Sequence, residues 1–211
     1  MRSVALAPGK RDGRRLRGDR SRAAILKHAV DVASVAGLAG LTFGQLAEAL
    51  QLSKGNLTVL FRDKEALQLA VLDTAVERFS EVVVVPGAAQ ATAIGRLRSL
   101  CDGWYRYLEC KTFPGGCFIY AAAHEYRARP GAIQDRVVAY FDVWKRKLGA
   151  EIRNARQRGE IRQVSTRECV VTLIAYQNAA HLAMLLGDLE TFSEARRLTR
   201  VFIDGLAEHA R

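Results

Sequence analysis

The sequence lacks the residue patterns that metal sites and catalytic centres require. Its four cysteines, Cys101, Cys110, Cys117 and Cys169, show neither CxxC spacing nor a histidine at metal-ligand spacing. In a reducing compartment they are most simply buried thiols. No glycine-rich phosphate loop is present either. We therefore expect no cofactor and no bound metal.

Two alternative uses of cysteine stay open. Cys110 and Cys117 flank the turn KTFPGG, so a redox pair is conceivable. Cys117 also follows two glycines and precedes His124, which would suit a thiol nucleophile at a helix start. No third, orienting residue accompanies this pair. A Cys-dependent enzyme is therefore the weakest of the alternatives for this chain.

Long, purely apolar runs are also missing. The most apolar stretch, residues 170–187, carries Gln177, Asn178 and His181, which argues against a lipid-spanning helix. The apolar run at residues 4–7 is too short for a secretory signal. We therefore expect a cytoplasmic protein with no membrane partner. No alternation typical of strands is long enough to assign, so we predict an all-α fold.

Acidic residues are scarce near the start of the chain. The net charge is +10, and residues 1–22 hold eight basic and two acidic residues, a local excess of +6. We interpret residues 1–18 as a basic, disordered arm that tracks phosphates or enters the minor groove of DNA. A solvated tail that only aids solubility is the alternative. The 211 residues suffice for one or two domains with a core.

Residues 42–61, TFGQLAEALQLSKGNLTVLF, predict two short helices separated by a sharp turn. Thr42 and Gln45 have capping-box spacing, so the first helix is expected to run from Thr42 to about Leu50. Ser53 offers the N-cap of the second helix. Leucines supply the apolar side that holds the two together, while polar side chains are left outside. This is a helix-turn-helix pattern.

The second helix of such a motif enters the major groove and reads base edges with its first turn. Lys54 suits a guanine or a phosphate, Asn56 suits adenine, and Gly55 leaves room for the backbone to approach. The expected partner is double-stranded operator DNA. The expected DNA contacts are Thr42, Gln45, Ser53, Lys54, Gly55, Asn56, Thr58, Val59 and Lys64, with Arg14, Arg15 and Arg17 of the arm.

Residues 20–72, from ILKHAVDVASVAG to RDKEALQLAVLD, resemble the DNA-binding domain of the TetR/AcrR repressors. Three sites depart from that family: Gln51 stands where Gly is frequent, Thr58 where Tyr is usual, and residues 59–60 where an aromatic or His pair is common. A left-handed backbone at Gln51 would cost roughly 1 kcal/mol. The resemblance implies a repressor in which a small molecule moves the two DNA heads apart and releases the operator.

Helical periodicity continues through the rest of the chain. We expect about nine helices in all, divided into the arm, a DNA-binding domain at residues 19–64 and a helical ligand-binding and dimerisation domain at residues 65–211. The further helices are expected near residues 18–37, 63–85, 89–110, 117–128, 130–159, 165–187 and from 191 onward.

The middle helices concentrate aromatic and polar side chains. The resemblance implies that this region encloses a small-molecule pocket, although an aromatic stripe at helical spacing also suits a plain core. Polar groups within apolar helices need partners, and a ligand is one possible partner. The pocket candidates are Trp104, Tyr107, Phe118, His124, Tyr140, Trp144, Gln177, Asn178 and His181.

The helix at residues 169–186 is apolar nearly all the way round. We expect one side to pack inward and the other to contact a second subunit, together with the last helix. The interface candidates are Ala175, Ala179, Ala183, Leu198 and Phe202. A homodimer predicts an inverted-repeat operator. An architectural DNA-binding protein without a ligand is the alternative, which the size of the C-terminal part disfavours.

Overall fold

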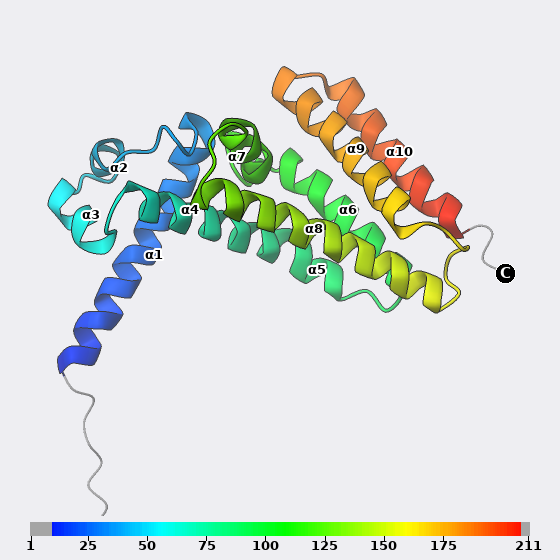
Figure 1. Cartoon of the computed structure of the whole chain (residues 1–211), viewed down its shortest axis with the longest axis horizontal. Coiled ribbons are helices and arrows are strands. Elements are labelled where there is room, and N and C mark those ends of the chain that lie inside the picture. The colour runs from blue at the N-terminus through cyan, green and yellow to red at the C-terminus, as the bar shows by residue number, and fades with distance from the viewer. Residues whose placement is uncertain (1–9, 208–211) are drawn as a thin grey trace, which may run out of the picture.

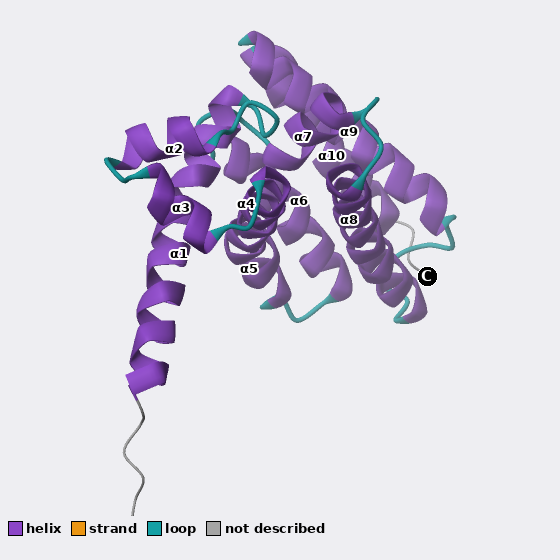
Figure 2. Cartoon of the chain, turned by 60° about the vertical axis from the view of Figure 1, so that its left-hand side comes forward, coloured by secondary structure: helices purple, strands orange, loops and turns teal. Residues whose placement is uncertain are grey.

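The computed structural model describes residues 10–207, and residues 1–9 and 208–211 lie outside the described part. Within residues 10–207 every regular element is a helix (Figure 2), which confirms the expected all-α fold. The elements are α1 (Lys10–Ala36), α2 (Phe43–Leu50), α3 (Lys54–Leu60), α4 (Lys64–Phe79), the π-helix η1 (Ser80–Val84), α5 (Val85–Ala88), α6 (Ala93–Glu109), α7 (Phe118–Tyr126), α8 (Ala132–Gln157), α9 (Thr166–Leu186) and α10 (Leu189–Ala207).

The helices form a small head and a longer body (Figure 1). α1, α2 and α3 gather at one end, around the start of α4. The continuous rod formed by α4, η1 and α5 then runs through the body beside α8. α6 contacts both α8 and α10, and α9 pairs with α10. The same rod therefore belongs to the head at one end and to the body at the other.

The start of α1 differs from the expectation. The helix begins at Lys10, so residues 10–18 of the expected disordered arm are helical. No proline lies between residues 10 and 36, and extending a helix that is already anchored adds one hydrogen bond for each residue fixed. The side chains of residues 10–19 and all of residues 1–9 lie outside the description, so the contacts of Arg14, Arg15 and Arg17 stay predictions.

The sequence predicted that the helix would end at about residue 85, before Pro86. The structure shows that it continues past Pro86. Pro86 lies in the first turn of α5, where its missing N–H needs no partner, and the helix continues to Ala88. The preceding turn, Ser80–Val84, adopts the wider π-helix. π-helical turns occur mostly as single interruptions of α-helices, frequently at functional sites.

Two later helices also begin at residues other than those expected. α6 begins at Ala93, four residues after the expected start, because the Thr92 hydroxyl accepts from the Gly95 N–H at 3.1 Å and acts as the N-cap. α10 begins at Leu189 rather than near 191. There the Asp188 carboxylate accepts from the Thr191 N–H at 2.9 Å, so Asp188 caps the helix before the expected start.

One hydrophobic core runs from Ile25 in α1 to Leu206 in α10, so head and body are packed as one unit. Gly115 in the α6–α7 turn lies very close to the head. A Cβ atom at this position would lie 1.7 Å from the backbone oxygen of Ser34 in α1. Only glycine allows the turn to come this close to α1.

α9 is the helix of the described chain that is long and apolar enough, by composition, to cross a membrane. It packs instead against α8 and α10 and buries Gln177 and His181 among them. These contacts make it a core helix whose outer side is apolar, and they give no support to a membrane span.

Candidate functional site

The head contains the expected helix-turn-helix. Thr42 and Gln45 form the complete capping box: the Gln45 N–H donates to Thr42 Oγ1 at 3.2 Å, and the Thr42 N–H donates to Gln45 Oε1 at 3.1 Å. Gln51 adopts the left-handed conformation with φ of 54°. Ser53 caps α3 by accepting from the Asn56 N–H at 3.3 Å. The fully buried Leu57 anchors α3 against the rest of the head.

The outer side of α3 is free. Ser53, Lys54, Gly55 and Asn56 in its first turn are all exposed, as are Thr58 and Val59 in its second. Val59 is 87% exposed, so its apolar side chain is free to contact another surface. The Thr58 hydroxyl donates to the Gly55 backbone oxygen at 3.0 Å. This helix end suits insertion into a major groove, where Val59 could contact a thymine methyl group.

Three other predicted DNA contacts have partners inside the protein. Thr42 and Gln45 are exposed, but their side chains bond to each other in the capping box. Lys64, at the start of α4, donates from Nζ to the backbone oxygen of Ala39 at 2.7 Å. An ammonium has three donors, so Lys64 can keep this bond and still face a phosphate.

The turn between α1 and α2 is held from two sides. Lys64 and Gln68 of α4 donate to the backbone oxygens of Ala39 and Leu38, at 2.7 and 2.6 Å. Glu125 of α7 accepts from the backbone N–H groups of the same two residues, both at 2.8 Å. The turn is therefore bonded at once to α4 and to α7, two helices that also wall a cavity in the body.

Arg78 makes a second junction between head and body. Its guanidinium pairs with the Asp31 carboxylate of α1 at 2.6 Å and donates to the Lys27 backbone oxygen at 2.9 Å. The guanidinium carbon lies 5.1 Å from the centre of the Phe113 ring, in the α6–α7 turn. This single side chain ties α4 to α1 and to the turn before α7.

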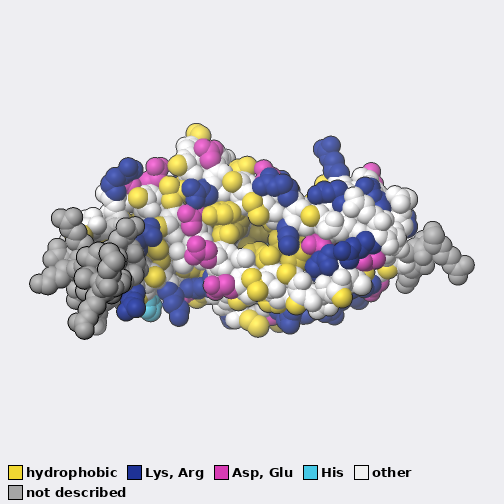
Figure 3. All heavy atoms as spheres, turned by 90° about the horizontal axis from the view of Figure 1, so that it is seen from below, with side chains coloured by type: hydrophobic (Ala, Val, Ile, Leu, Met, Phe, Trp, Pro, Cys, Tyr) yellow, Lys and Arg dark blue, Asp and Glu magenta, His cyan; other side chains and the backbone are white. Residues whose placement is uncertain are grey.

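The cavity has a volume of about 180 Å³ and lies between α4, η1, α6, α7 and α8. Figure 3 views the molecule from below and shows hydrophobic side chains around a hollow in the middle of that face. Mostly apolar and aromatic side chains form the walls. The lining residues are Val76, Phe79, Ser80, Val84, Trp104, Cys117, Ile119, Tyr120, Tyr140, Phe141, Val143, Trp144 and Lys147.

The structure brings three of the nine pocket candidates to this cavity: Trp104, Tyr140 and Trp144. Tyr107 and Phe118 are buried in the core beside it. His124, in the last turn of α7, is exposed. Asn178 is exposed as well, because one residue beyond the buried Gln177 the helix has turned by about 100°. These four residues do not line the cavity.

Gln177 and His181 lie one turn apart on α9 and are buried behind the cavity wall. Gln177 Oε1 accepts from the Trp144 indole N–H at 3.0 Å, and the His181 ring lies 5.0 Å from the ring of Tyr120. Gln177 Nε2, His181 Nε2 and the Tyr120 hydroxyl have no hydrogen-bond partner among the described residues. Burial, with a smaller contribution from the charge of His124, lowers the pKa of His181 to about 4.

Sequence reasoning missed the contribution of α4 and η1 to the cavity. Val76, Phe79, Ser80 and Val84 form one wall, yet none of them was among the expected pocket residues. The helical spacing of Val76 and Phe79 shows that they share a side of the helix, but not that this side faces a cavity. A helix side that faces a cavity has the same apolar pattern as one that faces a filled core.

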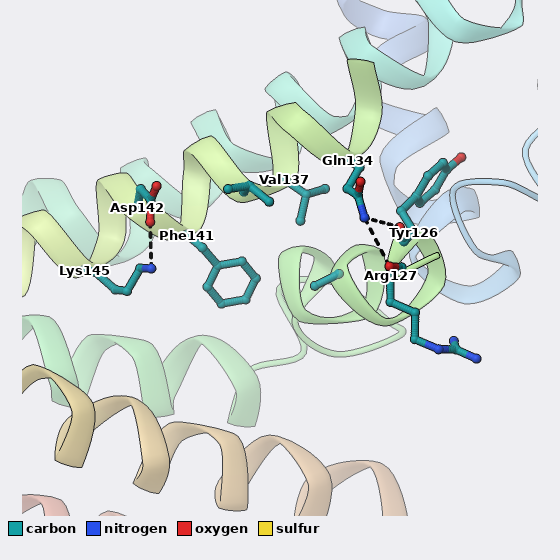
Figure 4. A pocket seen from close by; sticks show the side chains of 9 residues that line it. Tyr126, Arg127, Gln134, Val137, Phe141, Asp142 and Lys145 are labelled. Atoms are coloured by element: carbon teal, nitrogen blue, oxygen red, sulfur yellow. Dashed lines mark hydrogen bonds and ion pairs between the residues drawn. The ribbon is translucent and has the colours of Figure 1, made fainter. Parts of the chain in front are cut away.

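A second groove, also lined by Phe141, lies between α7 and α8 (Figure 4). Gln134 donates to the backbone oxygens of Tyr126 and Arg127 there, and Lys145 pairs with Asp142 at 2.6 Å. The polar groups at its edges thus satisfy one another. Phe141 is shared by the groove and the cavity and separates them.

The alternative catalytic reading has no geometric support. Cys117 is buried, and desolvation raises the pKa of its thiol, which is the reverse of nucleophile activation. His124 is exposed and makes no hydrogen bond to Cys117. Cys110 and Cys117 are both free thiols. Among the described residues no group of three or more His, Cys, Asp or Glu side chains is placed to hold a metal ion.

The outer side of α9 is apolar and uncovered. Ala175 and Ala179 are exposed there, while Leu198 and Phe202 of α10 are half-buried. Ala183, in contrast, is packed into the core of its own chain, so it does not belong to the ridge that the sequence suggested. The exposed ridge instead follows alternating steps of four and three residues and consists of Val171, Ala175, Asn178, Leu182 and Leu185.

Comparisons with known proteins agree with this architecture. The family model described as the tetracyclin repressor-like C-terminal domain matches residues 93–199, just over half of the chain. No curated protein matches the sequence. A solved TetR transcriptional regulator from Chloroflexus aurantiacus J-10-FL is 26% identical, with a TM-score of 0.82 over 89% of this chain and 96% of that one.

Two further solved structures share the fold. A TetR-family transcriptional regulator from Cytophaga hutchinsonii is 23% identical and superposes with a TM-score of 0.81 over 97% of this chain and 99% of its own. AibR, solved in complex with isovaleryl coenzyme A and operator DNA, is 19% identical, with a TM-score of 0.64 over 84% and 97% of the two chains. With its helix-turn-helix head and matching C-terminal domain, the chain belongs to the TetR family of DNA-binding transcriptional regulators.

Proposed function

We propose that the protein is a cytoplasmic, homodimeric repressor, without enzymatic activity, that a small molecule bound in the cavity releases from an inverted-repeat operator. One observation carries the proposal: the continuous rod α4–η1–α5 holds Lys64 beside the reading head and Val76, Phe79 and Ser80 in the cavity wall. A ligand that displaces this wall must move a helix whose other end positions α3.

The contacts between the cavity and the head support this coupling. Tyr140 lines the cavity, and its hydroxyl donates to the Asp73 carboxylate of α4 at 2.6 Å. Glu125 of α7, the helix that supplies Tyr120 to the cavity, holds the turn before α2. Allostery requires two sites that bias one shared element, and α4 is such an element here.

The uncovered ridge of α9 supports the homodimer. Contiguous apolar surface of this kind usually marks an interaction site on a soluble protein. A second copy can cover it by a two-fold contact, and the two heads would then lie on half-sites one DNA turn or a multiple apart. The AibR complex, which holds a ligand and operator DNA in the same fold, is consistent with both parts of the proposal.

Selection from a random DNA library tests the DNA-binding part. We expect the recovered sites to be inverted repeats bound with an affinity that falls steeply with salt. A screen for molecules that lower this affinity, repeated on a variant with the cavity filled by Val76→Trp, tests the effector part. The filled variant should bind the operator with an affinity that the molecule does not change. Recovery of non-repeated sites, or an effect that survives in Val76→Trp, would count against the proposal.

A further inference from the structure

We propose that the effector is a small aromatic carboxylate, one ring with a short acid chain, whose ring lies between the aromatic walls and whose carboxylate pairs with Lys147. The inference deepens the proposed function and rests on it, because it assumes that the cavity is the effector site. Three features of the cavity carry it: its size and ring geometry, its charge, and an unpartnered hydroxyl.

Size limits the ligand to about one ring. Six aromatic side chains wall the cavity, and they meet edge to face, as Phe79 does with Trp144 at 5.4 Å and Tyr120 with Phe141 at 5.0 Å. A further ring between such walls gains the same edge-to-face contacts. An apolar cavity of roughly 150 Å³ holds benzene, whereas drug-sized ligands need about 300 Å³ or more. A cavity of about 180 Å³ therefore fits a single ring with a short chain.

Charge selects an anion. Lys147 is the charged residue among those that line the cavity, and its side chain is 36% exposed, which places it at the rim. Its ammonium lies 3.9 Å from Glu151 Oε1, the limit of an ion pair. Glu151 is already engaged through Oε2 by Arg96 at 2.8 Å. The Lys147 ammonium is thus available to a second carboxylate.

A cationic ligand is disfavoured although aromatic walls often bind cations. No acidic side chain lines the cavity. Two carboxylates bond to lining residues, and each is paired with an arginine: Glu151, beside Lys147, with Arg96 at 2.8 Å, and Asp73, beside Tyr140, with Arg136 at 2.6 Å. The fixed charge at the rim is therefore positive, and an amine there would face Lys147 without a partner.

The third feature is the Tyr120 hydroxyl. Tyr120 lines the cavity and is 5% exposed, and its hydroxyl has no partner among the described residues. Burial raises its pKa, so it stays a neutral donor. Phe141, which packs on Tyr120, and Lys147 are six residues apart on α8, about 9 Å along the axis. We expect a phenylpropionate with a ring oxygen, which is about this long, to lie with its ring beside Tyr120 and its carboxylate at Lys147.

Intrinsic fluorescence can report directly on the cavity, because the only two tryptophans of the chain, Trp104 and Trp144, both line it. We would titrate the full-length protein with 3-phenylpropionate, 3-phenylpropionamide and 3-phenylpropylamine, which share one skeleton and differ in charge. The acid should bind roughly fivefold more tightly than the amide, as a partly exposed ion pair allows, and the amine should bind most weakly.

Lys147→Gln should remove the difference between acid and amide and leave the affinity for the amide unchanged. Lys145→Gln is the matched control, since Lys145 lies on the same helix but faces the α7–α8 groove and pairs with Asp142. Thermal melting confirms that both variants are folded. A hydroxyl on the ring should tighten binding severalfold in the wild type and give no gain in Tyr120→Phe.

The proposal is overturned if the amine binds as tightly as the acid, if Lys147→Gln keeps the preference for the acid, or if none of the three changes the fluorescence. Operator affinity measured in parallel separates this from the proposed function. If the acid binds through Lys147 but operator affinity stays constant, the ligand class stands and the effector role fails. If another molecule releases the operator without changing the fluorescence, the effector role stands and the cavity assignment fails.

Discussion

The Tyr140 hydroxyl on α8 donates a hydrogen bond of 2.6 Å to the Asp73 carboxylate on α4. Tyr140 lines the cavity, and Asp73 lies on the helix that begins beside the reading head. The bond therefore joins the site where we expect an effector to the element that must move. Arg136 pairs with the same carboxylate oxygen, so the position of α4 against α8 is fixed by two donors.

Tyr140→Phe should weaken the coupling between cavity and DNA. The ring stays in the cavity wall, so ligand affinity should change by less than about threefold, while the ratio of operator affinities with and without ligand should fall toward one. Allosteric couplings amount to about 1–3 kcal/mol, enough to measure by fluorescence anisotropy of labelled operator. Tyr126→Phe is the control, because the Tyr126 hydroxyl makes no hydrogen bond to α4. If the coupling is unchanged in Tyr140→Phe, the Tyr140–Asp73 bond does not transmit ligand binding to the DNA-binding head.

Glu125→Gln should loosen the turn between α1 and α2. The glutamine side chain has one acceptor oxygen, so it cannot accept from the Leu38 and Ala39 N–H groups as the carboxylate does. Losing one charge-assisted bond to a partly buried N–H should lower the free energy of unfolding by about 1–2 kcal/mol in urea titrations. Glu109→Gln, which breaks the surface pair with Arg196, should cost less than about 1 kcal/mol. Equal losses would contradict the proposed role of Glu125.

His181 should make the fold less stable in mild acid. Burial lowers the pKa of His181 from 6.5 to about 4. Between these pH values His181 is protonated in the unfolded chain and neutral in the folded chain. The contribution of neutral His181 to the free energy of unfolding is fully present above pH 6.5 and is lost as the pH falls toward 4. The loss amounts to about 2 kcal/mol at pH 5. His181→Gln should remove this loss, whereas replacing the exposed His28 should not. Urea unfolding at pH 7.5 and pH 5, at one protein concentration, measures both.

Lys54 and Asn56 should affect DNA binding in different ways. Asn56→Ala should cost about 1–3 kcal/mol and relax the preference at one base pair, because Asn pairs with adenine through two bonds. If Lys54 contacts a phosphate, Lys54→Ala should weaken all sites and lower the log–log salt slope by about 0.9. Arg167 is an exposed residue at the start of α9, far from α3, so Arg167→Ala should change neither the operator affinity nor the salt slope. An equal loss on all sites for Asn56→Ala would remove it from the reading residues.

Ala179→Arg should produce a folded monomer. Ala179 is exposed in the single chain, so arginine fits there without disturbing the core, but it would bury an unpaired charge in a dimer seam at a cost of several kcal/mol. Light scattering at micromolar concentration should show half the wild-type mass, with tight operator binding lost. Val138→Arg, on the exposed side of α8, should stay dimeric. A wild-type monomer, or a dimeric Ala179→Arg, would place the interface elsewhere.

The sequence by itself determined the local structure of the head. Thr42, Gln45 and Ser53 cap helices through atoms within three residues of one another, so their spacing alone predicts the bonds that the structure shows. The all-α fold and the family resemblance follow from similarly local patterns. The misplaced start of α10 has the same explanation, since Asp188 offered an equally local cap three residues before the expected start.

Only the tertiary structure decided which sides of the body helices face a cavity, a core or open surface. Ala179 and Ala183 are about one turn apart on α9, yet one is exposed and the other packed, because a step of four residues turns the side chain about 40° past a full turn. Phe79 and Lys147 meet at the cavity although 68 positions separate them in the chain. Such contacts depend on how whole helices pack, and an apolar pattern is the same whether the space beside it is filled or empty.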